Sequence, residues 1–318
     1  MQNDMNPSVS VIMGVYKEPL EWIRQAVDSI LSQTFSDFEF IILLDNPNYV
    51  EGLNLLKEYE SKDNRIVIVC NDENIGLTKS LNKGLALARG KYIARMDADD
   101  ISLPNRFEYQ FSFMEEHPNV IVLGTNIKYI GRKSLVKGND SIKFDNSSIR
   151  AQMIMVNCIA HSSVFIRSCV LKDNHIKYDE SYRQSQDYRL WELLSPYGDF
   201  AVLPDKLLKY RVSDQQITKS QTKGQSGLAS SVRLRLQKKW LQNVGCSFTD
   251  EELEYYPFRI IKRLRTDNRT NNSQEYKAYI QYAYLLSGDH TWSLMSFLRY
   301  DIRKMSLLSI MRLLVRII

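Results

Sequence analysis

The chain has 318 residues, of which 44% are hydrophobic and 25% charged, a balance typical of a soluble protein with about two domains. No window approaches 18 uncharged apolar residues and no basic-flanked apolar leader stands at the N-terminus, so we expect neither a spanning helix nor a signal peptide. The four cysteines lack paired metal-type spacing, which favours incidental thiols in a reducing cytoplasm.

The net charge of +5 is unevenly distributed along the chain. Residues 220–318 carry 16 Lys and Arg against 8 Asp and Glu, whereas residues 1–219 carry 26 against 29. This asymmetry predicts a catalytic domain, 1–219, followed by a basic C-terminal region, 220–318. An anionic membrane surface or a polyanionic substrate would suit the basic region. Nucleic acid is not expected, because no recognised binding motif accompanies the charge.

Apolar runs and helical periodicity alternate in the first part of the chain. Buried strands are predicted at 9–15, 38–44, 66–69 and 92–96, and helices at 20–31, 53–59 and 77–88. Such alternation predicts an α/β fold with a mainly parallel sheet joined by right-handed crossovers. Further along, we expect a helix at 107–116, strands at 120–129 and 161–167, and a polar loop or short strands at 132–148.

The basic C-terminal region has helical patterns throughout. After a polar lid or linker at 213–227, helices are predicted at 228–244, 250–265, 273–286 and 291–318. The last of them has a wide apolar face interrupted by Arg and Lys. That pattern fits an interfacial helix on an anionic membrane and, equally, a helix packed on the catalytic domain with snorkelling arginines.

Three carboxylates, Asp97, Asp99 and Asp100, follow the strand at 92–96. Open α/β sheets bind ligands at the carboxyl ends of their strands. Like charges packed there are costly unless a cation offsets them, so the cluster indicates a divalent metal that carries a diphosphate. The alternative is a loop in which Asp100 caps the next helix, which is the commoner explanation of an isolated Asp-x-Asp.

Several segments resemble family 2 glycosyltransferases in the same order. They are Val-Ser-Val-Ile-Met-Gly-Val-Tyr at 9–16, Ser-Ile-Leu-Ser-Gln-Thr-Phe at 29–35, Phe-Glu-Phe-Ile-Ile-Leu-Leu-Asp at 38–45, Asn-Ile-Gly at 74–76, Ser-Leu-Asn-Lys-Gly at 80–84, 90–100 and Pro104-x-Arg106. The resemblance covers roughly residues 8–215 and is of the bacterial capsule and lipopolysaccharide type. It implies a GT-A fold, a Rossmann-like mixed, mainly parallel sheet flanked by helices, with a nucleotide-sugar donor and Mn²⁺ or Mg²⁺.

The resemblance also assigns a nucleotide site, made of Val15, Tyr16, Glu18, Asp45, Lys79, Asp97 and Ala98. Asp45 would reach the base, and Lys79 would lie near the base or the diphosphate. Asp99 would be the direct metal ligand, with Asp97 at the ribose or the metal. Asp100 is assigned instead to capping of the next helix. Structural alternatives remain for two of these residues, because Tyr16 is also explained as a packing residue and Lys79 as a solvated helix charge.

A second segment would supply the catalytic base that deprotonates the acceptor. Gln186-Asp187 stands where relatives have Glu-Asp at a helix start, so the resemblance implies that Asp187 is the catalytic base, with a plain helix N-cap as the alternative. An inverting transfer needs one base, whereas a retaining double displacement also needs a nucleophilic carboxylate. Gln186, Arg211 and His161 are candidates for sugar contacts, although we favour a structural, hydrogen-bonded core role for His161.

The sequence therefore predicts a metal-dependent, inverting hexosyl- or N-acetylhexosaminyltransferase. It would move a sugar from a nucleotide sugar, most simply a UDP-sugar, to a cell-surface glycan or lipid-linked oligosaccharide. The enzyme would be cytoplasmic, or peripheral on the inner face of the membrane, and its oligomeric state stays open. One alternative is a metal-dependent nucleotidyltransferase, but the Gly-rich loop expected after the first strand is absent. The other is a degenerate transferase that serves as a glycan-binding module.

Overall fold

The computed structural model describes residues 6–131, 145–153, 157–213 and 222–243. Met1–Ile149 and Asn157–Val232 form one compact unit, and Arg150–Val156 with Arg233–Ile318 form the second. Most of the second unit lies outside the described residues, including the helices predicted at 250–265, 273–286 and 291–318. No described helix is long and apolar enough to cross a membrane.

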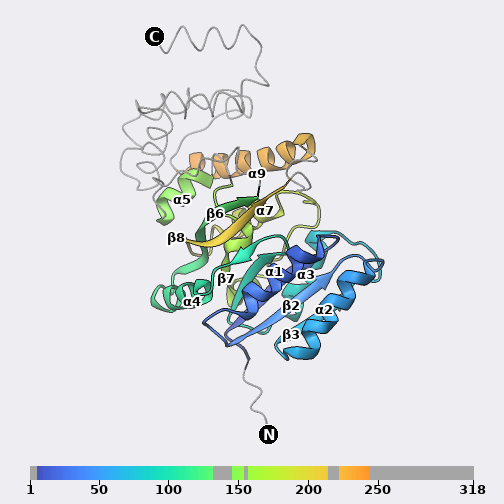
Figure 1. Cartoon of the computed structure of the whole chain (residues 1–318). Coiled ribbons are helices and arrows are strands. Elements are labelled where there is room, and N and C mark those ends of the chain that lie inside the picture. Colours follow the sequence, from blue (N-terminus) through green and yellow to red (C-terminus); the bar gives the residue numbers. More distant parts are fainter. Residues whose placement is uncertain (1–5, 132–144, 154–156, 214–221, 244–318) are drawn as a thin grey trace. The chain divides into compact units, whose positions relative to one another are not determined.

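The first half of the chain alternates strands and helices as its apolar pattern predicts (Figure 1). The elements are β1 Val9–Val15, α1 Leu20–Leu31, β2 Phe38–Leu44, α2 Val50–Lys62, β3 Ile66–Cys70, α3 Leu77–Leu87 and β4 Tyr92–Asp97. The following elements are β5 Ile101–Ser102, α4 Arg106–Glu116, β6 Val120–Gly131, α5 Asn146–Met153, a 3₁₀ turn His161–Ser163, β7 Phe165–Arg167, α6 Ser168–Asp173, α7 Gln186–Leu194, β8 Asp199–Val212 and α9 Thr222–Asn243.

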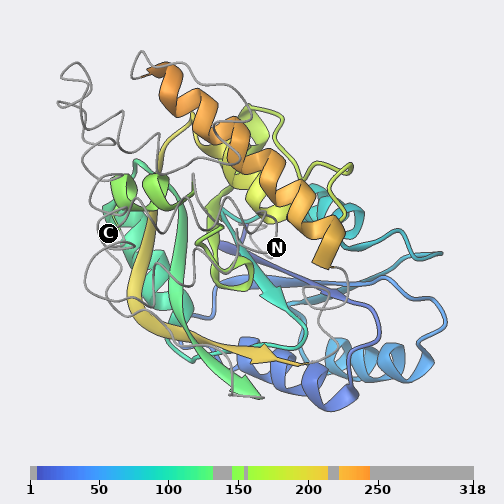
Figure 2. The ribbon, with the colours of Figure 1, turned by 90° about the horizontal axis from the view of Figure 1, so that it is seen from above.

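The strands form one mixed sheet in the order β3-β2-β1-β4-β7-β6-β8-β5. β1 to β4 pair in parallel, β7 is antiparallel to both β4 and β6, and the short β5 is antiparallel to β8. The long β6 and β8 run side by side in parallel and curve together (Figure 2). The prediction of a mainly parallel sheet is therefore confirmed, and the antiparallel strands all belong to its second half.

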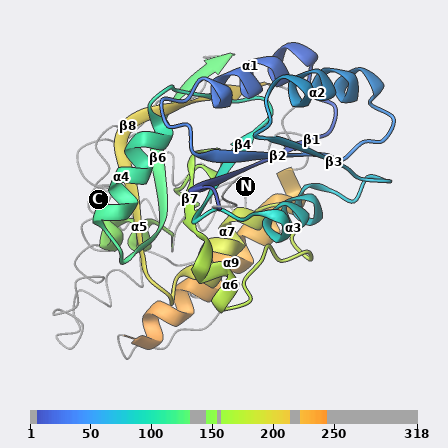
Figure 3. The same cartoon turned by 90° about the horizontal axis from the view of Figure 1, so that it is seen from below.

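The two faces of the sheet carry different layers. On one face Val11 and Met13 of β1 join a buried core with Ile23 of α1 and other apolar side chains. On the other face α3 approaches closely, because a Cβ added to its Gly84 would lie 2.7 Å from Ile12 Cγ2. Figure 3 shows α1 and α2 on one side of the sheet and α3, α6 and α7 on the other. The site is built on this second side.

Three segments have secondary structure that differs from the sequence-based expectation. The strand predicted at 161–167 is limited to Phe165–Arg167, since His161–Ser163 forms a 3₁₀ turn closed by the hydrogen bond from Ser163 N to Ala160 O. Of the polar loop predicted at 132–148, the structure describes the last residues, and they are helical from Asn146. The predicted lid or linker is helical from Thr222, earlier than expected.

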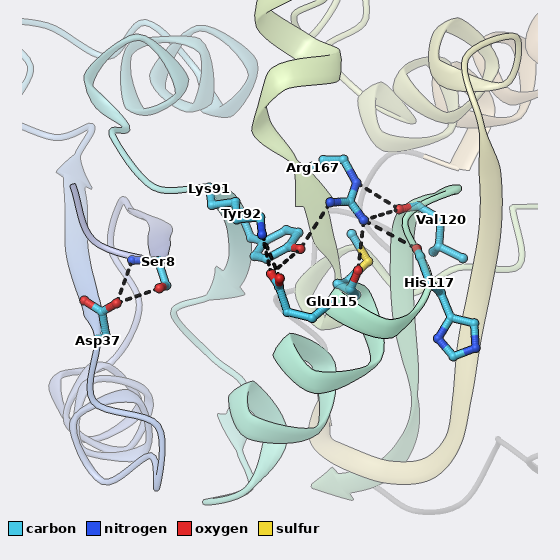
Figure 4. Close-up of polar contacts among 9 residues, drawn as sticks. Ser8, Asp37, Lys91, Tyr92, Glu115, His117, Val120 and Arg167 are labelled. Atoms are coloured by element: carbon cyan, nitrogen blue, oxygen red, sulfur yellow. Dashed lines mark hydrogen bonds and ion pairs between the residues drawn. The ribbon is translucent and has the colours of Figure 1, made fainter. Parts of the chain in front are cut away.

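Arg167 ties the start of β4 to the end of α4 (Figure 4). Its guanidinium donates to the carbonyl oxygens of Met114 (3.0 Å) and Val120 (3.2 Å) and to the hydroxyl of Tyr92 (3.2 Å). These acceptors include carbonyls that helix α4 and the following turn leave unpaired. This network lies at the end of β4 opposite to Asp97.

Replacing Arg167 with Met should lower the free energy of unfolding by about 2–3 kcal/mol, because partly buried carbonyls lose a charged donor. Urea denaturation measures this loss. Lys91→Met is the matched control, since Lys91 is half exposed in its ion pair with Glu115 and such surface pairs contribute about 0–1 kcal/mol. Equal losses in the two variants would contradict the assigned role of Arg167.

Candidate active site

The carboxylates of Asp97, Asp99 and Asp100 meet at the end of β4. One oxygen from each lies within 4.8 Å of the others, and Asp100 is fully buried whereas the other two are partly exposed. The turn after β4 thus gathers the three charges that the sequence places together. Crowding of this kind requires either protons or a cation.

Asp100 does not cap a helix, so that expectation is wrong. Helix α4 begins at Arg106, with Asn105 at its N-cap position, whereas Asp100 precedes β5. Its two oxygens accept hydrogen bonds from Ser162 Oγ (2.5 Å) and from the backbone N–H of Arg211 (2.8 Å). Burial, with the neighbouring Asp97 and Asp99 charges, raises the pKa of Asp100 well above its ordinary value. Asp100 therefore fastens β8 and the 3₁₀ turn to the site.

Asp99 has the properties of a ligand for a cation. Burial first, and then the charges of Asp97 and Glu18, raise the pKa of Asp99 to about 7. A divalent cation would offset these charges, and carboxylate oxygens are the ligands that Mg²⁺ and Mn²⁺ prefer. Asp97 and Asp99 fit such an ion, whereas both oxygens of Asp100 are already engaged.

Arg211 lies beside the acidic turn. Its Nε donates to the backbone oxygen of Asp99 (2.7 Å), its Nη2 donates to Gln25 (2.6 Å), and its guanidinium lies 4.9 Å from the ring centroid of Trp22. These contacts make Arg211 a brace between α1, β8 and the turn. A sugar contact by Arg211 stays a prediction.

The residues expected at the nucleoside lie at the end of β1. Val15 is buried, and Tyr16 after it is 38% exposed, so its ring is accessible for stacking. Glu18 accepts a hydrogen bond from the backbone N–H of Tyr16 (2.8 Å), and burial raises the pKa of Glu18. Tyr49 donates to the backbone oxygen of Glu18 (2.7 Å), which holds this loop against α2.

Asp45 anchors the loop before α3. Its carboxylate is buried and accepts hydrogen bonds from Asn71 Nδ2 (2.8 Å) and from the backbone N–H groups of Ile75 (3.0 Å) and Gly76 (2.8 Å). Gly76 has a φ of +83°, a conformation that L side chains rarely adopt. Lys79, in the first turn of α3, is exposed. Contacts of Asp45 and Lys79 with a base stay predictions.

Asp187 lies in the first turn of α7, on the second side of the sheet. Ser185, the residue before α7, has a left-handed backbone conformation (φ +56°), and this strained geometry turns the chain into the helix. Asn157 Nδ2 donates to Asp187 Oδ2 (2.6 Å). Burial raises the pKa of Asp187 and the Asp97 charge adds to this, while N–H donors at the helix start lower it. Gln186, the first residue of α7, is buried.

His161 is hydrogen-bonded, consistent with the structural role that we favour for it. Its Nε2 lies 2.7 Å from the hydroxyl of Tyr178, and its ring packs edge-on against Trp191 with centroids 6.2 Å apart. Burial, together with the charge of Arg95, holds the pKa of His161 well below its ordinary value, so the ring is neutral.

The structure adds residues that the sequence did not single out as site residues. Arg95 pairs with Asp97, Asn157 holds Asp187, and Tyr210 lies among the carboxylates, where burial and the Asp97 charge raise its pKa. Arg95 could have been singled out from the sequence, because a charged residue in the middle of a buried apolar strand needs an explanation. Asn157 and Tyr210 could not, since chain segments far from their partners determine where these two residues lie.

Comparison with known proteins identifies the family of this chain. The family model "Glycosyl transferase family 2" matches residues 10–172. An uncharacterized glycosyltransferase of Methanocaldococcus jannaschii is 38% identical over 221 residues, which are 69% of this chain and 76% of the relative. The O-antigen biosynthesis glycosyltransferase WbnJ of Escherichia coli is 33% identical over 242 residues, covering 74% of this chain and 91% of the relative.

Two solved structures share the fold. Residues 1–349 of S. aureus TarS, in complex with UDP-GlcNAc, match with a TM-score of 0.60 at 17% identity, covering 90% of this chain and 93% of that one. The mannosyltransferase PcManGT of Pyrobaculum calidifontis, with GDP-Man and Mn²⁺, matches with a TM-score of 0.56 at 13% identity, covering 98% and 80%. The fold is thus that of the GT-A glycosyltransferases. The chain belongs to glycosyl transferase family 2, and relatives in that family act in polysaccharide biosynthesis.

Proposed function

We propose that the chain is a metal-dependent, inverting glycosyltransferase that moves a sugar from a nucleotide sugar to a hydroxyl of a cell-surface glycan or lipid-linked oligosaccharide. The observation that carries the proposal is the pairing of two chemically distinct carboxylate sites. The Asp97–Asp99 cluster lies at the end of β4, and a separate carboxylate, Asp187, lies in the first turn of α7, a helix on the face of the sheet that carries Asp97.

The first site would hold the donor diphosphate. Mn²⁺ or Mg²⁺, held by Asp97 and Asp99, would neutralise charge that develops on the departing nucleoside diphosphate. Glu18 and the exposed ring of Tyr16 lie at the neighbouring strand end, where the nucleoside would bind. A UDP-sugar is the simplest donor. TarS, which shares the fold, is described in complex with UDP-GlcNAc, although PcManGT is described with GDP-Man.

The second site would activate the acceptor. Asp187 would take the proton of the acceptor hydroxyl as that oxygen attacks the anomeric carbon, and the raised pKa of its carboxyl favours this role. Asn157 would fix the orientation of the carboxylate through the 2.6 Å hydrogen bond. A retaining double displacement would need a second carboxylate beside the anomeric carbon. Asp97 and Asp99 are assigned to the metal and the diphosphate, which leaves Asp187 as the proposed base, so a single displacement with inversion is the simpler reaction.

The acceptor proposal rests on relatives. WbnJ is described as an O-antigen biosynthesis enzyme and AmsE of Erwinia amylovora as an amylovoran biosynthesis enzyme, which supports an acceptor on a growing surface polysaccharide. The family resemblance suggests acceptors at the cytoplasmic face of the membrane, where the basic region 220–318 would favour anionic lipid. We therefore propose a cytoplasmic enzyme that is peripheral on this face.

A thermal-shift screen tests the donor and metal together. We expect UDP-GlcNAc, UDP-glucose or GDP-mannose, at about 100 times its Kd, to raise Tm by about 5–10 °C with Mn²⁺, because a ligand that binds the native state stabilises it by about 2.7 kcal/mol at that concentration. The same nucleotide sugar in EDTA should give a much smaller shift. A shift that is equal in Mn²⁺ and EDTA would contradict metal dependence. Proton NMR of the product linkage then tests inversion.

A further inference from the structure

Arg95 is a buried cation with unused hydrogen-bond donors. Its side chain is 2% exposed and its Nη2 donates to Asp97 Oδ1. Its Nε and Nη1 have no hydrogen-bond partner among the residues that the structure describes. A guanidinium stays charged, and each of its N–H groups left buried and unpaired destabilises the folded protein. An acceptor oxygen from a bound molecule would remove this destabilisation.

The position of Arg95 indicates which part of a bound molecule could supply this acceptor oxygen. In the β1–β4 register Arg95 lies opposite Ile12, so its side chain is on the face that α3 and α7 cover (Figure 3). Asp97, two residues later, is on the same face. Arg95 therefore shares a face of the sheet with Asp97, beneath the layer of α3 and α7.

Two other buried groups of this layer lack partners within the described part of the chain. They are Nε1 of Trp191 and Oδ1 of Asn157. Trp191 lies one helical turn after Asp187 and packs against His161, and Asn157 donates to Asp187. Open donors and an open acceptor beside an aromatic ring match a molecule rich in hydroxyl groups, which both donate and accept.

We propose that Arg95 is a specificity-determining residue of the donor site, whose Nε–H and Nη1–H donate to uncharged oxygens of the transferred sugar. The inference rests on the proposed function. The oxygen is a hydroxyl or an amide carbonyl rather than a carboxylate, because the charge of Arg95 is already matched by Asp97. The donor is thus a neutral hexose or N-acetylhexosamine, and a uronic acid is disfavoured.

Isothermal calorimetry with saturating Mn²⁺ tests this role. The probes are UDP, UDP-glucose, UDP-GlcNAc, GDP and GDP-mannose, and the quantity is the ratio of the Kd of the bare nucleotide to that of its sugar form. For the sugar nucleotide that binds, Arg95→Gln should lower this ratio about 10- to 100-fold relative to wild type, since a hydrogen bond from a charged donor is lost. Arg95→Lys, which keeps the charge beside Asp97, should lower it less.

A merely structural role gives a different result. If Arg95 only orients Asp97 or binds water, its loss weakens bare nucleotide and nucleotide sugar alike, and a ratio within about twofold of wild type overturns the inference. Arg65→Gln is the matched control, because Arg65 pairs with Asp63 before β3 and should leave the ratio unchanged. Wild-type protein that binds none of the five probes with Mn²⁺ would instead overturn the donor proposal, and this inference with it.

A test on wild type alone covers the case in which the variants fold poorly. UDP-glucose with UDP-glucuronate, and UDP-galactose with UDP-galacturonate, differ only at C6. We expect wild type to bind the uronates at least about tenfold more weakly than the neutral partner that binds. Tighter binding of a uronate would overturn the assignment of an uncharged oxygen.

Discussion

Asp187→Asn is expected to lower the transfer rate by about 10²- to 10⁴-fold, the contribution of a positioned general base. The amide keeps the size of the side chain and can still accept from Asn157, but it cannot take the acceptor proton. Nucleotide-sugar and Mn²⁺ binding should stay within about twofold of wild type, as measured by calorimetry beside a transfer assay. Glu192→Gln, on the same helix, is the matched control and should keep the wild-type rate.

The pH profile gives this prediction a second readout. A base works when deprotonated, and burial raises the pKa of Asp187, so the wild-type rate should fall on acidification from a point above the ordinary aspartate range. The residual activity of Asp187→Asn should lack this acid limb. Full transfer by the variant, or an unchanged acid limb, would remove Asp187 from the base role.

Asp99→Asn is expected to weaken Mn²⁺-dependent nucleotide binding at least about a hundredfold, because the cation loses a charged ligand that contributes several kcal/mol. Calorimetry of UDP with and without Mn²⁺ measures this. Asp173→Asn, an exposed substitution at the end of α6, is the control and should bind as wild type does. Unchanged Mn²⁺-dependent binding by Asp99→Asn would contradict the assigned metal site.

The same variant should be more stable than wild type when metal is absent. The pKa of Asp99 is about 7 in the folded protein, above its ordinary value near 3.8, so the stabilisation from its proton is complete below about pH 4. That stabilisation is lost as the pH rises through about 7. We therefore expect Asp99→Asn in EDTA to have a Tm several degrees above wild type at pH 8.

The first half of the fold follows from local patterns. The run 38–44 is apolar at six of seven positions and ends at Asp45, and β2 has these bounds. The helix predicted at 20–31 matches α1 because its apolar residues recur at helical spacing. By contrast, β8 was not predicted as a strand, since it contains Pro204 and its middle residues are exposed. Its pairing with β6, a partner far along the chain, forms this strand.

The candidate site, like the fold, could be predicted from the sequence only in part. The carboxylates Asp97 and Asp99 could be predicted because they lie together at a strand end and belong to a recognisable motif. The role of Asp100 could not, since its partners Ser162 and Arg211 are 62 and 111 residues away in sequence. The open donors of Arg95 likewise become visible only once α7 covers β4.

Mn²⁺ titration followed by electron paramagnetic resonance tests the role of Asp97 and Asp99 most directly. If these carboxylates and a nucleoside diphosphate share one cation, UDP or GDP should tighten Mn²⁺ binding to the wild-type protein at least about tenfold, and Mn²⁺ should tighten nucleotide binding equally. Asp99→Asn should lose this coupling. Mn²⁺ binding that is the same with and without nucleotide, or coupling that persists in Asp99→Asn, would contradict the assignment of a metal-bridged donor site.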